Sequence, residues 1–316
     1  MWKTVFRQRI DAFLAGCARE GKVKLIVSPD VDGVVSACLL SKYALESHGL
    51  KTEINGTYDC KRIVTVGGDG LEECMWVDLD LPQKNVMCIG QHLCGDIGGY
   101  KHTLSFNPNE YFENRETWTK FPFGTAQLFY HGLFEEGVYK VGSAAEALLA
   151  HCDSTYFNCQ KYKPNCSKWI TKMFDGSTFM DRLVNNEYKS TMLTAHTNAI
   201  AALEPHVTVK KKWTKQTEGW DRVRSRQTCK ALKKAPTEGM GHLVKMFGAC
   251  GAVFGSTVAF RGTPESAVCI WTGRRKMVPL YSERIRKEGL KKYLEAVEAK
   301  SHAIVSTRFL SLTLEE

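Results

Sequence analysis

The sequence predicts an α/β protein in which a mainly parallel sheet is flanked by helices and is followed by a second, smaller α/β domain. Three observations support this fold class. Short apolar runs typical of buried strands alternate with segments whose apolar residues recur at helical spacing. These runs are almost continuously apolar, as in parallel strands that are covered on both faces. The chain of 316 residues is long enough for about two domains.

The first elements predict the beginning of a βαβ unit. Residues 4–19 carry apolar side chains at helical spacing, which indicates an amphipathic opening helix. A buried strand is expected over residues 23–27 and a helix over residues 34–47. The loop between them, residues 28–33, contains two aspartates, so an acidic loop separates the strand from the helix.

Two further strands are expected at residues 74–77 and 85–89. Each is followed by polar residues: Asp78 and Asp80 come after the first strand, and His92 comes after the second. Open α/β sheets place their ligands at the carboxyl ends of parallel strands. We therefore expect these side chains to meet the acidic loop at one edge of the sheet.

The rest of the chain divides into a helical part and a basic part. Helices are expected over residues 123–134, 143–152, 166–174 and 179–203, and Pro205 ends the last of them. Short strands are expected over residues 252–260 and 267–271, and a final helix over residues 282–300. The expected domains are an acidic first domain at residues 1–204 and a basic, substrate-binding C-terminal domain at residues 205–316.

Charge is distributed unevenly along the chain. Residues 205–292 contain 20 Lys and Arg against 6 Asp and Glu, a net charge of +14, whereas the remaining residues carry −5. Such a segment suits a polyanion, most simply a nucleic-acid backbone; a solvated basic surface without a partner is the alternative. Arg is well suited to this role because its planar fork matches phosphate oxygens. The candidate substrate contacts here are Lys210, Lys211, Lys212, Arg274 and Arg275.

The cysteines and the apolar runs indicate a protein of the cell interior. Many of the 12 cysteines lie inside apolar runs, and no CxxC pair occurs, so we expect mostly reduced, buried thiols. No stretch reaches the ~18 to 20 apolar residues that cross a bilayer, and the first residues lack the apolar core of a signal peptide. We therefore expect a cytoplasmic protein without a membrane partner.

Four aspartates separated along the chain are candidate ligands for a hard divalent cation. Asp30 and Asp32 lie in the acidic loop, Asp78 follows a predicted strand, and Asp153 ends an apolar helix. Several unpaired carboxylates at one place cannot all stay ionised without a cation, and hard divalent cations prefer such oxygen ligands. For the acidic loop alone, capping of the following helix is an equally good interpretation.

Four short motifs occur in order along the first half of the chain. They are Ser28-Pro29-Asp30-Val31-Asp32-Gly33 with Ser36, Val77-Asp78, Gly90-Gln91-His92 and Asp153-Ser154-Thr155. Two further segments are Phe106-Asn107-Pro108-Asn109 and Phe123-Gly124-Thr125-Ala126. Together they resemble the DHH-family phosphoesterases, a group that includes RecJ-type exonucleases and nano-RNases, over residues 23–160. The resemblance implies a DHH-type α/β domain that hydrolyses phosphoesters with a pair of Mn²⁺ or Mg²⁺ ions.

The resemblance also implies a role for each acidic motif residue. Asp30 and Asp32 would be metal ligands from the first motif. Asp78 would bridge the two ions, and Asp153 would bind the second ion. Two cations held in this way can polarise a phosphoryl group and generate a hydroxide near neutral pH.

The third motif differs from the family pattern, which reads Asp-His-His. Gly90 stands in place of a carboxylate, and Gln91 offers a neutral oxygen in place of the histidine that usually binds metal. His92 corresponds to the histidine that usually faces the substrate phosphate. From the resemblance we expect Asp78, Gln91 and His92 to be catalytic and Ser36 to bind substrate.

These features favour a metal-dependent phosphodiester hydrolase, most simply an exonuclease or an enzyme that degrades single-stranded oligonucleotides. Two alternatives stay open. The first is a catalytically decayed DHH scaffold that serves as a nucleic-acid-binding or replication accessory protein, and the altered third motif favours it. The second is a phosphatase or phosphodiesterase of small nucleotides, which would leave the +14 segment without a role.

Overall fold

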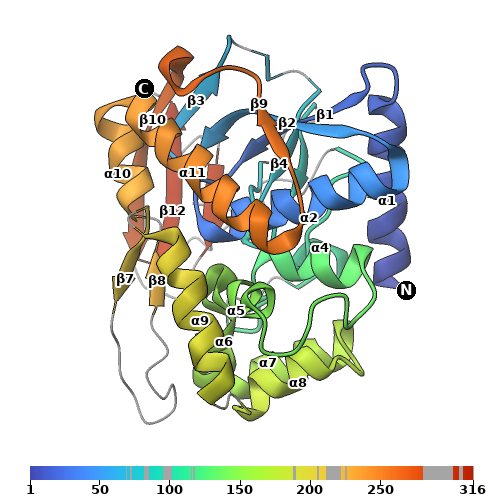
Figure 1. Cartoon of the computed structure of the whole chain (residues 1–316). Helices are drawn as coiled ribbons and strands as arrows, with labels where there is room; N and C mark the ends of the chain where they lie inside the picture. Colours follow the sequence, from blue (N-terminus) through green and yellow to red (C-terminus); the bar gives the residue numbers. More distant parts are fainter. Residues whose placement is uncertain are drawn as a thin grey trace.

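The structure, a computed structural model, describes residues 1–68, 70–71, 73–81, 85–94, 102–114, 116, 118–187, 190–204, 206–210, 222–224, 226–279, 302–305 and 309–315. The fold is α/β, with a mixed sheet flanked by helices (Figure 1). The expected fold class is confirmed at this level.

The centre of the sheet is parallel. Its strands follow the order β5, β4, β1, β2, and β9 lies parallel to the first half of β2. Val27, Val77 and Ile89, the last residues of three of these strands, lie side by side in register. The strands are β1 (Lys22–Val27), β2 (Lys51–Tyr58), β4 (Met75–Val77), β5 (Met87–Ile89) and β9 (Val258–Phe260). Whatever follows β1, β4 and β5 therefore begins at the same edge of the sheet.

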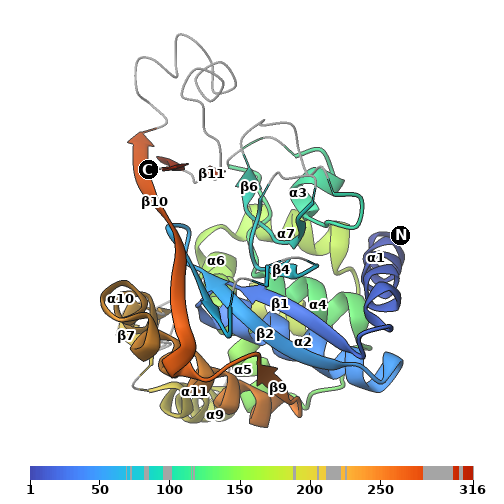
Figure 2. The ribbon, with the colours of Figure 1, turned by 90° about the horizontal axis from the view of Figure 1, so that it is seen from above.

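Beyond β2 the sheet is antiparallel and continues in the order β3, β10, β12, β11, β6. These strands are β3 (Arg62–Val66), β6 (Leu93–Cys94), β10 (Ala267–Pro279), β11 (His302–Val305) and β12 (Phe309–Glu315). Figure 2 shows β10 running from the region of α11 towards β11 and β6. Since these C-terminal strands extend the same sheet, a separate second domain is not shown, and the boundary at residues 204 and 205 stays a prediction. A small separate ribbon joins β7 (Thr208–Lys210) to β8 (Arg222–Arg224).

Helices surround the parallel centre. α2 packs directly against α11, and it also packs against α4 and α5 (Figure 1). The helices of the first half are α1 (Trp2–Cys17), α2 (Val31–His48), α3 (Pro108–Tyr111), α4 (Thr125–Leu133), α5 (Ala144–His151), η1 (Cys152–Ser154), α6 (Thr155–Lys161) and α7 (Lys163–Met173). Those that follow are α8 (Thr178–Asn185), α9 (Ser190–Leu203), α10 (Arg226–Lys234), α11 (Pro236–Phe254) and η2 (Pro264–Ser266).

The two faces of the sheet contribute to different hydrophobic clusters. On β1, Leu25 and Val27 belong to the main core with the helices, whereas Ile26 packs with Trp76 and Cys88 on the other face. All five residues are at most 5% exposed. Because side chains alternate along a strand, this burial on both faces explains why the last three residues of β1, Leu25-Ile26-Val27, are all apolar.

Two expectations about elements were wrong. The helix expected over residues 179–203 is two helices, because Asn186 adopts a left-handed conformation with φ of 59° and ends α8. The strand expected over residues 252–260 begins only at Val258, since α11 continues to Phe254 and ends at Gly255, whose φ is 67°. Small apolar residues do not distinguish a buried helix from a strand.

The sequence analysis missed β2 and β3. β2 carries the buried polar residues Asn55 and Thr57, so it lacks the apolar run of its neighbour β1. Gly56 allows a close approach of β3: a Cβ there would lie 2.4 Å from the carbonyl oxygen of Val64. The strand is therefore specified by backbone packing rather than by an apolar pattern.

Two further expectations concern cysteines and membranes. The cysteines whose state is described are free thiols, and most of them are buried. Among the described residues, no helix combines the length and apolar character needed to cross a bilayer. The expected helix at residues 282–300 lies outside the described part of the chain.

Replacement of Gly56 by Ala should destabilise the protein, because the added methyl group would collide with the backbone of β3. We expect a loss of about 1–3 kcal/mol in the free energy of unfolding, measured with urea. The matched control is Gly16→Ala at the exposed end of α1, where nothing lies within 4 Å of the added Cβ. That change should be neutral or stabilising by up to about 1 kcal/mol. Equal effects at the two positions would contradict the close approach.

Candidate functional site

The acidic loop after β1 caps the following helix. Asp30 has an extended backbone, with φ of −126°, and its Oδ1 accepts a hydrogen bond from the backbone N–H of Gly33 at 3.0 Å. The loop is tight, since a Cβ on Gly33 would lie 2.4 Å from the carbonyl oxygen of Ser28. Asp30 is half-buried, so its second oxygen can serve another partner while the first holds α2.

Asp32 is buried and joins α2 to the start of α4. Its two carboxylate oxygens accept hydrogen bonds from the backbone N–H groups of Thr125 and Ala126, both at 2.8 Å. These N–H groups lie in the first turn of α4, where a helix favours negative charge. A Cβ at Gly124 would lie 2.9 Å from both oxygens of Asp32, so only glycine fits beside this carboxylate.

Asp78 lies directly after β4 and is also buried. Its backbone is left-handed, with φ of 56°, and its N–H donates to the carbonyl oxygen of Ile89 at 2.8 Å. The Thr125 hydroxyl donates to Asp78 Oδ1 at 2.7 Å. Thr125 therefore binds Asp78 through its side chain and Asp32 through its backbone, which brings the first two motifs together.

Asp153 enters the same region from the end of α5. Asp153 and Ser154 both have left-handed backbones, with φ of 42° and 59°, where the chain turns from α5 into α6. Asp153 Oδ2 accepts a hydrogen bond from Gln91 Nε2 at 2.9 Å. A contact thus connects the fourth motif to the third.

The four aspartates influence one another electrostatically. Burial, followed by the charges of Asp153 and Asp30, raises the pKa of Asp32 to about 8. Burial and the charges of Asp32 and Asp30 raise the pKa of Asp78 well above its ordinary value. Desolvation and Asp30 raise the pKa of Asp153, although His92 and Lys120 oppose the rise. Without a cation, the cluster therefore favours protonated carboxyl groups near neutral pH.

Within the described residues, none of the four carboxylates forms an ion pair with Lys or Arg; the pairs that are present lie elsewhere. In that same part of the chain, no three His, Cys, Asp or Glu side chains already share a position for one ion. The carboxylates are oriented instead towards the hydrogen-bond donors of α2, α4 and Gln91.

The third motif combines an amide and an imidazole. Gln91 is buried, and its Oε1 has no hydrogen-bond partner within the described structure. Its backbone oxygen accepts from Asn109 Nδ2 at 2.9 Å. His92 Nδ1 lies 2.9 Å from Asp80 Oδ2. Burial disfavours the charged ring, but the hydrogen bond and charge of Asp80 raise the pKa of His92 above its ordinary value.

Several residues of this site were not assigned a role from the sequence. Thr125 and Asn109 occur in the two segments that resemble stretches between motifs, but nothing in those segments shows which carboxylate or carbonyl they bind. Asn107 Nδ2 donates to Asp80 Oδ1 and to the carbonyl oxygen of His92, both at 2.8 Å.

Ser36, expected to bind substrate, is fully buried in α2, and its hydroxyl has no partner among the described atoms.

The described residues do not test the expected basic contacts. Lys210 ends β7, and Arg274 and Arg275 lie in β10 opposite Leu314 and Thr313, but the positions of these three side chains are not described. Residues 211 and 212, the other two lysines of the expected set, lie outside the described residues. Their roles stay predictions.

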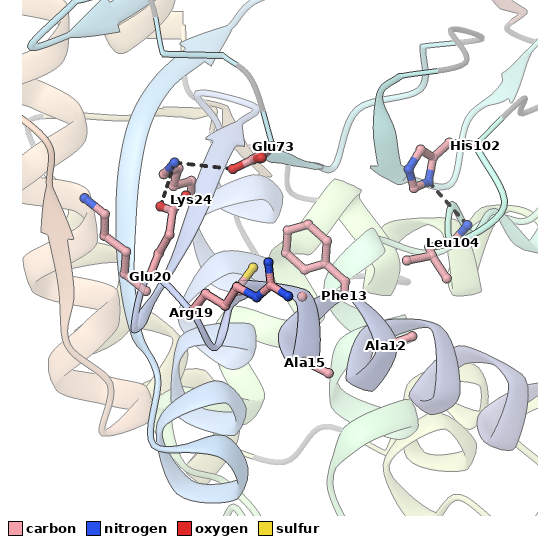
Figure 3. A pocket seen from close by; sticks show the side chains of 12 residues that line it. Ala12, Phe13, Ala15, Arg19, Glu20, Lys24, Glu73, His102 and Leu104 are labelled. Carbon is pink, nitrogen blue, oxygen red and sulfur yellow. Dashed lines mark hydrogen bonds and ion pairs between the residues drawn. The ribbon is translucent and has the colours of Figure 1, made fainter.

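An open groove lies near the opposite end of β1 (Figure 3). It has a volume of about 630 Å³ and is lined by residues of α1, by the start of β1 and by His102. Lys24 in this groove pairs with Glu20 at 2.7 Å and with Glu73 at 3.8 Å. The groove contains none of the candidate site residues, so we assign it no role in their chemistry.

Comparisons with models of protein families, with curated proteins and with solved structures found no match for this chain. The functional assignment therefore depends on the chemistry and the geometry of the residues themselves.

Stability without divalent cations should fall as pH rises from about 4, the ordinary pKa of an aspartate, to about 8, the pKa of Asp32, and should level off above that value. A carboxyl group whose pKa is raised on folding stabilises the folded state at low pH, and this contribution is lost as pH rises through the folded pKa. Between the unfolded and the folded pKa, a single such group lowers the free energy of unfolding by up to about 1.4 kcal/mol per pH unit. Asp32→Asn should reduce the loss, measured as the midpoint of thermal unfolding at several pH values in chelator.

The matched control for this measurement is Asp175→Asn, at an exposed position after α7. It should leave the dependence on pH unchanged. An Asp32→Asn protein whose stability falls with pH as steeply as that of the parent would contradict the raised pKa.

Proposed function

We propose that the protein is a divalent-metal-dependent phosphodiesterase that acts on single-stranded nucleic acid, most simply as an exonuclease or an oligonucleotide-degrading enzyme. The observation that carries the proposal is the convergence of Asp30, Asp32, Asp78 and Asp153 near the carboxyl ends of the central strands, where Asp30, Asp32 and Asp153 each raise the pKa of another aspartate. Such a cluster costs folding free energy, and a divalent cation would remove that cost.

The donor set fits Mn²⁺ or Mg²⁺. The carboxylates of Asp30, Asp32, Asp78 and Asp153 are hard oxygen ligands, and the unpartnered Oε1 of Gln91 is a further neutral oxygen nearby. Bound divalent cations would polarise a phosphoryl oxygen and lower the pKa of a bound water. We propose that Asp32 and Asp78 keep their bonds to Thr125 while their remaining lone pairs face the cations.

His92 and Lys120 are the groups best placed to meet the substrate. The His92 side chain is 27% exposed, and its Nδ1 is engaged by a fully buried Asp80 carboxylate, so its other edge can face a phosphate. The charge of Lys120 acts on both His92 and Asp153. A lysine at this position would attract a phosphodiester towards the carboxylates.

The basic C-terminal segment supports a nucleic-acid substrate. Its helix α10 carries the exposed residues Lys230, Lys233 and Lys234. Burial, and after it the charge of Asp30, raises the pKa of Cys229 in the same helix, so α10 lies within electrostatic range of the acidic loop. A phosphate backbone that lies along α10 would therefore approach the carboxylate cluster.

Purified protein with Mn²⁺ should shorten a labelled single-stranded oligonucleotide, and Asp78→Asn should reduce the rate by at least about 100-fold, because Asp78 would bind both cations. The measurement is product length on a denaturing gel with and without chelator. Asp175→Asn is the matched control and should keep the parental rate. Activity that survives Asp78→Asn, or that persists in chelator, would rule out the proposed metal site.

A second candidate function is a non-catalytic nucleic-acid-binding protein on the same scaffold. The hydrogen bond from Gln91 Nε2 to Asp153 favours it, because it occupies a carboxylate oxygen that a cation would need. Calorimetric titration with Mn²⁺ separates the candidates: an enzyme site should bind with a Kd in the micromolar range or below, whereas a decayed site should release little heat. Gln91→His should tighten binding by about 10-fold or more if the amide is what weakens the site.

Binding to single-stranded DNA should weaken steeply with salt. If about four phosphates are neutralised, the slope of log K against log salt should be near −3 for a single strand. Replacement of Lys230, Lys233 and Lys234 by Gln should make this slope shallower, measured by fluorescence anisotropy with inactive Asp78→Asn protein. A flat salt dependence would favour the remaining alternative, a small nucleotide substrate.

A further inference from the structure

We propose that Asp80 is a positioning residue for His92, and that its carboxylate occupies the space that a side chain at position 90 would otherwise fill. This inference rests on the proposed function, in which His92 faces the substrate. The third motif has no carboxylate at position 90. The inference extends the proposed function by assigning that carboxylate to Asp80, which follows β4 and lies beside Gly90.

The space beside position 90 carries the first part of the inference. A Cβ added to Gly90 would lie 2.3 Å from Asp80 Oδ1 and 2.5 Å from Oδ2 and from the carboxyl carbon. These distances are far below normal van der Waals contact, so residue 90 can have a side chain only if the Asp80 carboxylate is absent or leaves its present position and its hydrogen bonds. The two positions share one volume, and the chain fills it from position 80.

The hydrogen bonds of Asp80 carry the second part. Asp80 is 1% exposed, and Asn107 Nδ2 donates to its Oδ1 at 2.8 Å. Its Oδ2 lies 3.1 Å from the backbone N–H of His92, which donates to it, and 2.9 Å from His92 Nδ1. A buried carboxylate with charge-assisted bonds on both oxygens is held rigidly, and it holds the ring that binds it.

This arrangement determines which nitrogen of the neutral His92 ring carries the proton. The Asp80 carboxylate can only accept, so Nδ1 is the donor and Nε2 is left as the acceptor. Gln91 Nε2 lies 3.5 Å from His92 Nε2, and an amide N–H there also suits an acceptor. His92 thus presents one defined nitrogen at the exposed edge of its ring.

The chosen experiment moves the carboxylate between the two positions. Asp80→Asn, which keeps the shape, should abolish exclusive protonation at Nδ1, because an amide cannot accept all three hydrogen bonds. Asp80→Gly should do the same. The double change Asp80→Gly with Gly90→Asp should restore the Nδ1 proton, since it returns a carboxylate to the same volume. Gly90→Asp alone should lower the unfolding midpoint, because two side chains would then compete for that volume.

The primary readout is long-range ¹H–¹⁵N NMR of protein labelled at histidine, recorded at alkaline pH where the ring is neutral. The protein has 9 histidines, and His92→Gln assigns the signal that belongs to this ring. The second readout is the rate of oligonucleotide cleavage. Asp80→Asn and Asp80→Gly should lower kcat by about 10- to 100-fold with little change in KM, and the double change should recover most of that loss.

The two readouts separate the inference from the function on which it rests. If the double change leaves the His92 proton distributed between Nδ1 and Nε2 to the same extent as Asp80→Gly alone does, the positioning role is wrong. If the tautomer follows the carboxylate but the parent protein cleaves no nucleic acid, the positioning role stands and the proposed hydrolase activity is wrong. A parental His92 protonated at Nε2 would also overturn the inference.

Discussion

Repulsion among buried carboxylates shapes how the protein packs around the carboxyl ends of its central strands. Asp32 and Asp78 lie inside the protein beside Asp30 and Asp153, and burial together with mutual repulsion raises the pKa of the two buried groups. Local donors offset part of this cost. The first turn of α4 gives two N–H groups to Asp32, and the Thr125 hydroxyl serves Asp78, so this helix terminus acts as a partial positive charge. α4 begins close to Asp32 because its N–H groups bind this carboxylate. The approach leaves no room for a Cβ at position 124, where the residue is glycine.

The sequence predicts the strands that can be recognised from their own apolar residues. β4, β5 and the last three residues of β1 are apolar because both faces of the sheet are buried there, and each strand ends where a polar group begins, so their positions and shared edge follow from the pattern. The apolar pattern does not predict a strand whose side chains are polar and form hydrogen bonds with the neighbouring backbone. In β2, Asn55 donates to the carbonyl oxygen of Gly70 and Thr57 to that of Val27, so these polar side chains each donate a hydrogen bond inside the protein. No periodicity of apolar residues can indicate such a strand.

In the candidate site, too, some features can be predicted from the sequence and others cannot. Aspartates at strand ends were accessible from the sequence, because a carboxylate after an apolar run is itself an unusual combination. The contacts that unite them were not, since Thr125 lies 93 positions from Asp32 and 47 from Asp78. Motif comparison treats each position separately, so Gly90 counts as a lost carboxylate. In three dimensions the carboxylate of Asp80 fills the volume beside Gly90, from a residue 10 positions earlier in the chain.

For the two proposed functions, metal-dependent enzyme and non-catalytic binding protein, the difference would be which partners occupy the lone pairs of the carboxylates. An ionised carboxylate has about four acceptor positions, so Asp32 can hold both N–H groups of α4 and still bind a cation. Asp153 is in a different position, because Gln91 donates to it and must turn away, or exchange its amide ends, before Oε1 can join the same cation. A histidine at position 91 would present a neutral nitrogen acceptor instead and would face no such conflict. Under the proposed function, the single amide at the third motif would therefore control how readily the four aspartates bind a metal ion, while the contacts of α4 with Asp32 and Asp78 hold the aspartates together in either case.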